Sequence, residues 1–175
     1  MDAETPSARG EVPVSVVGTV VEGHGVASGR KEDPRFPGGT IAMQIPHFAT
    51  RGLDLTGWYP GTINVSTGAR SVEILRAEFT FREVAWHPVE PAEDFSFVAC
   101  SVSVDGGHPV EGFLYHPHPE TKPEHFQEPG VLEILLNERL DGVRSGVTVR
   151  LWFREGAVRI EKTGNSRAAD PRFPT

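Results

Sequence analysis

Two polar residues in a segment that we expect to be extended could bind a metal ion. Thr62 and Asn64 are two positions apart and follow Pro60 and Gly61, a pair that is typical of a turn. Alternate residues of a strand point to the same face, so a hydroxyl and an amide oxygen should lie side by side. Such hard, neutral oxygens suit Mg²⁺ that takes its other ligands from phosphates and water. The alternative is a turn that enters a strand whose polar face happens to hold these two residues.

Glu133 could take part in acid–base chemistry. It interrupts an apolar segment, since Leu132 and Ile134 flank it. A carboxylate in such a strand must face either solvent or a polar cavity. A substrate hydroxyl within hydrogen-bond reach would explain it, because the carboxylate could orient that hydroxyl or accept its proton. A solvated strand residue is the other interpretation.

A glycine-rich segment follows the first apolar strand pattern and could bind phosphate. Gly23, Gly25 and Gly29 would let backbone N–H groups converge on an anion without obstruction by side chains. The segment is not a Walker loop, because no Gly-Lys-Ser/Thr follows. It is not a dinucleotide fingerprint either, because Ser28 stands where the third glycine would be and no helix pattern follows. An ordinary glycine-rich turn remains the alternative.

Four histidines, His108, His116, His118 and His125, fall in one stretch of the chain. His-x-His on a strand can chelate a transition metal, so a cupin-like enzyme is a further hypothesis. The acid that a cupin needs four or five residues after the second histidine is missing, since positions 122 and 123 are Lys and Pro. A proline-rich exposed loop with solvated histidines is the competing interpretation. We find no serine–histidine–acid order with a nucleophile elbow and no cysteine motif.

The elements that must position these residues are mostly strands. Apolar residues alternate with a period of two, and the 19 Gly and 15 Pro indicate many turns. We expect strands at 14–21, 63–66, 75–86, 95–104, 110–116, 131–135, 147–153 and 157–161. Short strands separated by turns favour a closed or nearly closed barrel, which leaves no sheet edges exposed. The candidate helices are short, at 137–141 and 47–53, and residues 30–39 are a candidate lid.

The totals are those of one small globular domain. We expect a flexible tail at 1–13, a single β-barrel domain at 14–162 and a second flexible tail at 163–175. A net charge of −7 argues against a general nucleic-acid or anionic-membrane surface. Cys100, the single cysteine, is expected in a buried strand and cannot form an internal disulfide. Without an apolar run of about 18 residues or a secretory signal pattern, a cytoplasmic location is expected.

Taken together, the order and spacing of these segments resemble the archaeal-type CTP-dependent riboflavin kinases. The resemblance spans residues 14–153. It is carried by Gly-Thr-Val-Val-Glu-Gly-His-Gly at 18–25, Pro-Gly-Thr-Ile-Asn-Val at 60–65, Glu-Gly-Phe-Leu at 111–114 and Leu-Glu-Ile-Leu-Leu at 132–136. The segment at 60–65 is the most specific of the four.

This resemblance implies a mainly β fold, a small six-stranded cradle-loop barrel with one or two short helices. In that family CTP donates its γ-phosphoryl group to the 5′-hydroxyl of riboflavin with Mg²⁺, and the products are FMN and CDP. The implied metal ligands are Thr62 and Asn64, the implied catalytic residue is Glu133, and Glu133 and His125 are expected to meet riboflavin. The implied nucleotide-binding residues are His24, Gly25, Val26, Ala27, Ser28, Gly29, Glu138, Arg139, Leu140 and Asp141.

The chain departs from the family pattern on the nucleotide side. Three residues, 26–28, separate the second and third loop glycines, and 30–39 is longer than the family pattern. Residues 143–146 replace an Asp-Gly-Asp turn, and 85–94 is extra length without an assigned role. The alternative is therefore a non-catalytic module that binds a flavin or a nucleotide on the same barrel.

Overall fold

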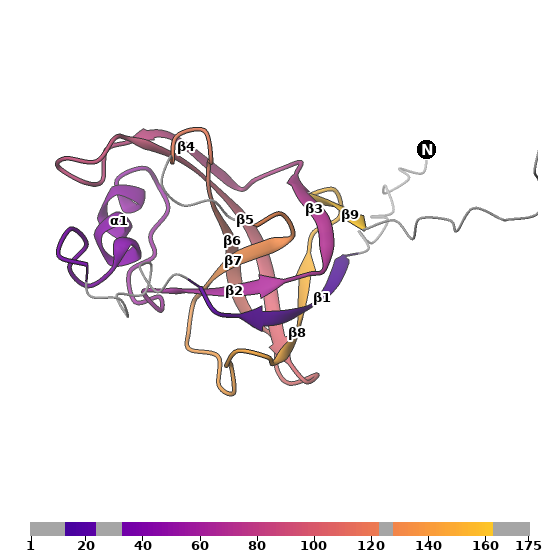
Figure 1. Ribbon diagram of the computed structural model, residues 1–175. Coiled ribbons are helices and arrows are strands. Elements are labelled where there is room, and N and C mark those ends of the chain that lie inside the picture. The colour runs from indigo at the N-terminus through magenta and orange to yellow at the C-terminus, as the bar shows by residue number, and fades with distance from the viewer. Residues whose placement is uncertain (1–12, 24–32, 123–127, 163–175) are drawn as a thin grey trace, which may run out of the picture.

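The computed structural model describes residues 13–23, 33–122 and 128–162 (Figure 1). Strands dominate the described part of the chain, which contains a single helix, α1 (Thr40–Ala49). The strands are β1 (Val14–Val21), β2 (Thr62–Ser66), β3 (Ala69–Ile74), β4 (Phe79–Val84), β5 (Glu93–Val104), β6 (Val110–Pro117), β7 (Val131–Leu136), β8 (Thr148–Phe153) and β9 (Val158–Lys162).

Six strands close into an antiparallel barrel. Neighbouring strands follow the order β5, β6, β7, β2, β1, β8, and β8 pairs back onto β5. A seventh strand, β4, joins the same sheet without preventing closure, because β5 is long enough to pair with both β4 and β8. Its first half pairs with β4, whereas its second half, from Cys100 to Val104, pairs with β8. The expected mainly β fold with a closed six-stranded barrel and few helices is therefore confirmed.

The interior of the barrel is filled by every second residue of its strands. Val65, Val98 and Leu151 are fully buried there, and Cys100 packs against the same cluster. We call this cluster the barrel core. β3 and β9 form a separate two-stranded ribbon, and Val72, Ile74 and Ile160 of the ribbon pack against the barrel core. The alternation that predicted the strands is thus the alternation between the core and the outer surface.

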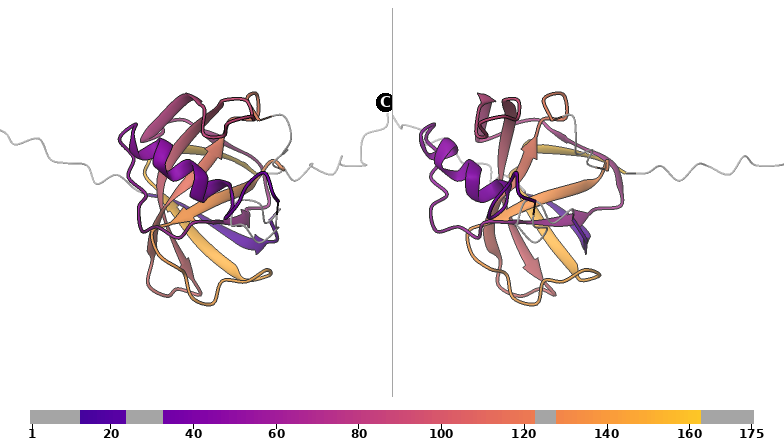
Figure 2. Two further views of the ribbon diagram at one scale, coloured as in Figure 1. Left: turned by 90° about the vertical axis from the view of Figure 1, so that its left-hand side faces the viewer. Right: turned by 60° about the vertical axis from the view of Figure 1, so that its left-hand side comes forward.

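A second core lies between α1 and the outer face of the barrel. α1 buries Ile41, Gln44 and Phe48, which are spaced by three and four residues and so share one face of the helix. The ring of Phe48 lies 5.1 Å from that of Phe95 and 5.0 Å from that of Phe97. We call this cluster the helix-side core. Figure 1 shows α1 and the β3–β9 ribbon on opposite sides of the barrel, and Figure 2 shows α1 crossing in front of the strands.

The predicted helices were misplaced. The helix begins at Thr40, directly after Gly38 and Gly39 with φ of 78° and 93°, and it contains Pro46. The prediction of a helix at 47–53 therefore overlaps only its last turn. Residues 137–141 form bends and a turn, so the second predicted helix is wrong. β3 was not predicted, and only 79–84 of the expected strand at 75–86 is a strand.

No helix in the described ranges is long and apolar enough to cross a membrane. Both predicted tails, apart from Pro13, and the predicted loop residues 24–29 lie outside the described residues.

Candidate functional site

The two proposed metal ligands and the proposed catalytic carboxylate come from neighbouring strands. β2 and β7 are antiparallel, with Asn64 directly opposite Glu133 and Thr62 opposite Leu135. Val65 and Ile134 of the same strands point into the barrel core. Because side chains alternate along a strand, Thr62, Asn64 and Glu133 therefore share the outer face. All three are half-buried.

This polar face borders the helix-side core. Leu135, which lies two positions from Glu133 on the same face, is fully buried in that core. The next strand, β6, pairs Phe113 with Leu135 and Leu114 with Ile134, and the negative charge of Glu133 acts on Tyr115, the next residue of β6. The site thus lies where a polar row of side chains meets the apolar layer beneath α1.

Tyr115 links the site to α1. Its hydroxyl donates a hydrogen bond to Oε1 of Gln44 over 2.8 Å, and both side chains are buried. Burial raises the pKa of Tyr115 well above its ordinary value, and the negative charges of Glu133 and Glu93 act in the same direction. The phenol therefore stays protonated and keeps its hydrogen bond to Gln44.

A pocket of about 250 Å³ opens beside Glu133. Residues of β3, β6 and β7 and of the segments that follow β6 and precede β7 line it. They include Val72, Ile74, Leu114 and Leu132, which are apolar, and Ser71, His116, Lys122, Glu128 and Glu133, which are polar. Glu133 belongs both to the wall of this pocket and to the row that contains Asn64. His125, the other expected substrate-binding residue, lies outside the described residues.

The glycine-rich segment begins against Asn64. A Cβ atom on Gly23 would overlap the side-chain amide of Asn64, so any larger residue there would have to displace that amide. The predicted nucleotide-binding residues His24, Gly25, Val26, Ala27, Ser28 and Gly29 come next in the chain and lie outside the described residues.

The second predicted nucleotide segment follows the end of β7. Glu138, Arg139 and Asp141 are exposed there, whereas Leu140 packs against the barrel core. Leu140 is therefore a core contact rather than a free surface group. Just before this segment, Oδ1 of Asn137 is buried and has no hydrogen-bond partner among the described residues. Sequence reasoning missed Asn137, although an amide directly after a buried strand is a signal for an acceptor at a strand end.

His116 and His118 of the predicted His-x-His pair differ in their partners. His118 Nε2 lies 2.8 Å from the hydroxyl of Ser96, and its Nδ1 lies 3.4 Å from the Arg82 guanidinium. The same Nδ1 lies 3.6 Å from Oε1 of Glu120. This serine–histidine pair was not found from the sequence. No three His, Cys, Asp or Glu side chains of the described segments form a metal site, so a cupin-type centre is not assembled there.

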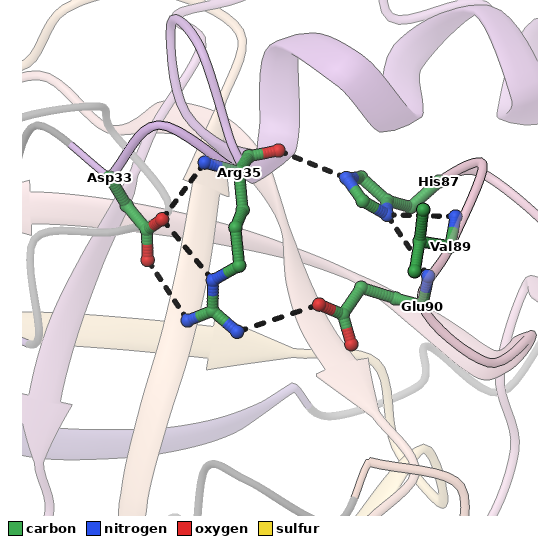
Figure 3. Close-up of polar contacts among 5 residues, drawn as sticks. All are labelled: Asp33, Arg35, His87, Val89 and Glu90. Carbon is green, nitrogen blue, oxygen red and sulfur yellow. Dashed lines mark hydrogen bonds and ion pairs between the residues drawn. The ribbon is translucent and has the colours of Figure 1, made fainter.

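The two insertions without an assigned role contact each other (Figure 3). Asp33 holds the Arg35 guanidinium with contacts of 3.2 and 3.0 Å, and Arg35 also reaches Glu90 at 3.5 Å. His87 Nε2 lies 3.0 Å from the carbonyl oxygen of Arg35, while its Nδ1 accepts hydrogen bonds from the backbone N–H groups of Val89 and Glu90. Residues 33–36 are therefore tied to the turn at 87–90. The described part of the expected lid at 30–39 is therefore held to the turn at 87–90 by these contacts.

Comparison with known proteins does not assign the chain to a family. No protein-family model matches it, and a search of curated proteins finds no match either. Any statement about function therefore depends on the chemistry and placement of the residues described above.

Proposed function

We propose that the protein is a riboflavin kinase-like phosphotransferase that moves the γ-phosphoryl group of CTP to the 5′-hydroxyl of riboflavin, assisted by Mg²⁺. The observation that carries the proposal is the pairing of Asn64 with Glu133 on one face of β2 and β7. Residues from two distant parts of the sequence, each expected in the site on separate grounds, are neighbours in the barrel. The closed six-stranded barrel is also the architecture that the resemblance implied.

Thr62 and Asn64 would hold the Mg²⁺ ion. Their hydroxyl and amide oxygens are hard ligands, and a neighbouring carboxylate adds negative charge, so the donor set suits Mg²⁺ that is also bound by phosphates and water. When bound, the ion would neutralise charge on the phosphates during transfer. The contact between Gly23 and Asn64 supports this arrangement, because a phosphate-binding glycine segment would begin beside the metal ligands.

Glu133 would bind and activate the substrate hydroxyl. It lies between Asn64 on one side and the pocket on the other. In the proposed step the hydroxyl oxygen forms a bond to the γ-phosphorus, the bond to the β–γ bridging oxygen breaks, and Glu133 takes the hydroxyl proton. The pocket, lined by apolar and polar residues together, has the composition expected for a site that binds a heteroaromatic ring.

The direct test is to incubate the protein with riboflavin, Mg²⁺ and each of the four nucleoside triphosphates, and to separate FMN from riboflavin. We expect FMN with CTP, and a smaller preference over ATP than the family pattern implies, since the nucleotide-side segments differ. Formation of FMN with ATP at an equal or higher rate would keep the kinase and remove the base preference. No FMN with any nucleotide, together with riboflavin binding, would favour the non-catalytic binding module.

Two substitutions test the assigned roles. Glu133→Gln should lower turnover by about 100-fold or more and leave riboflavin binding intact, because it removes a positioned acid–base group. Glu111→Gln, on the exposed side of β6, is the matched control and should keep full activity. Equal activity of the two variants would refute the role of Glu133. Asn64→Ala should raise the Mg²⁺ concentration needed for half-maximal activity by about 10–100-fold, by analogy with the loss of groups that support a metal site.

A further inference from the structure

The pocket beside Glu133 has a second polar wall whose role is not assigned. His116 and Lys122 line this wall, which consists of the end of β6 and the segment after it. Glu133 belongs to the neighbouring strand, β7. The charges that act on His116 are those of His118 and Glu120, whereas the charge of Glu133 acts on Tyr115. His116 and Glu133 both line the pocket, His116 from β6 and Glu133 from β7.

The hydrogen bonds of the two neighbouring histidines differ sharply. The rings of His116 and His118 lie 5.4 Å apart. His118 uses one ring nitrogen on Ser96 and the other on Arg82. His116 faces the pocket, and neither of its ring nitrogens has a hydrogen-bond partner among the described residues. The Lys122 ammonium group makes no salt bridge within the described ranges, although its positive charge acts on Glu93. Two donors on one wall are thus available to a ligand.

The chemistry of this wall suits a ring that carries carbonyl groups. Burial lowers the pKa of His116, so the imidazole is neutral at neutral pH and offers one N–H donor. Lys122 offers three donors and a positive charge. The neighbouring Pro117 and Pro119, which also line the pocket, have rigid rings that pack against a flat ligand at little cost in conformational entropy.

We infer that His116 and Lys122 bind the ring of the substrate by donating hydrogen bonds to its carbonyl oxygens, while Glu133 of the neighbouring strand meets the chain hydroxyl. This inference rests on the proposed riboflavin kinase function. It makes the β6 wall the part of the site that selects a planar, carbonyl-bearing ring. The β7 wall is then the part that selects the alcohol.

Two ligands separate ring contacts from chain contacts. Riboflavin has the ring and the ribityl chain, whereas lumichrome has the tricyclic ring with its carbonyl groups and no ribityl chain. Binding of each is measured by the change in ligand fluorescence on titration with protein. The variants are His116→Phe, which keeps a flat ring and removes both nitrogens, and Lys122→Met, which keeps the apolar stem. His108→Phe, at an exposed histidine in the turn before β6, is the matched control.

We expect each variant to raise the dissociation constants of riboflavin and lumichrome by the same factor, about 5- to 10-fold, as for the loss of one hydrogen bond to a buried ligand. The KM for riboflavin should rise with them, while kcat changes less than twofold, because these residues do not touch the reacting hydroxyl. His108→Phe should bind both ligands like the unmodified protein. Circular dichroism and the melting temperature establish that each variant is folded.

Three results would overturn the inference, and they are distinguishable. Weaker binding of riboflavin with unchanged binding of lumichrome would place His116 or Lys122 on the ribityl chain. Unchanged binding of both ligands by both variants, in a protein that still makes FMN, would remove the β6 wall from the site and leave the kinase assignment standing. An unmodified protein that binds neither ligand and makes no FMN would refute the proposed function, and this inference with it.

Discussion

The buried hydrogen bond between Tyr115 and Gln44 should contribute measurably to stability, because it joins α1 to the barrel beside the proposed site. Tyr115 is 2% exposed and Gln44 is 1% exposed, and their oxygens lie 2.8 Å apart. Tyr115→Phe would leave Oε1 of Gln44 without its donor in a place from which water is excluded. Such a loss costs about 1–3 kcal/mol of unfolding free energy. For a domain of this size, that lowers the melting temperature by about 2–4 °C per kcal/mol.

The assay is urea unfolding followed by tryptophan fluorescence, with Tyr59→Phe as the matched control. Tyr59 is half-buried and its hydroxyl makes no hydrogen bond among the described residues, so its loss should change the unfolding free energy by less than about 0.5 kcal/mol. Gln44→Met completes a double-mutant cycle. Removing both polar groups should cost less than the sum of the single losses, by at least about 0.5 kcal/mol. If Tyr115→Phe is as harmless as Tyr59→Phe, the hydrogen bond does not hold α1 in place.

Three further predictions concern other described residues. Burial raises the pKa of Glu93 above 4.5, so its contribution to the unfolding free energy is greatest below that pH and is lost as the pH rises through the folded-state pKa. Glu93→Gln should therefore flatten this part of the stability profile, and parallel profiles of variant and parent would contradict the assignment. Gly23→Ala should displace the amide of Asn64 and so raise the Mg²⁺ concentration that FMN formation requires. An unchanged Mg²⁺ titration would show that the close approach of Gly23 to Asn64 is not needed. Burial raises the pKa of the Cys100 thiol to about 12, so the folded protein should react with iodoacetamide at pH 8 far more slowly than protein in urea; equal rates would disprove its protection.

Part of the candidate site could be predicted from the sequence because it depends on short-range order. Thr62 and Asn64 are two residues apart in a strand, so their shared face follows from the strand period alone. Glu133 was notable because an ionised group in an apolar strand needs a polar environment. Neither pattern contains the partner strand. The sequence therefore indicated the components of the site, and did not indicate that Asn64 and Glu133 are opposite each other.

Other parts of the site depend on contacts between distant segments. The bond of His118 to Ser96 occurs because β5 and β6 pair in a register that places Ser96 opposite His116. Without that register His116 and His118 look equivalent, although only His118 is held by protein groups on both nitrogens. The helix at 40–49 was likewise hidden. Its face of Ile41, Gln44 and Phe48 is short and contains a polar residue, and Tyr115 of β6 supplies the partner that allows Gln44 to be buried.

The sequence by itself determined that the protein is a barrel of short strands, because alternating apolar residues and frequent glycine and proline leave little room for long helices. The tertiary structure alone decided how that barrel closes and what lies on its outer face. β5 changes partner from β4 to β8 along its length, and Phe95 and Phe97 on its outer side become a second core once α1 covers them. The physical reason is that period-two alternation specifies which side chains share a face. Which strand lies beside which, and what covers the outer face, depend on the burial and hydrogen bonds gained between segments far apart in the chain.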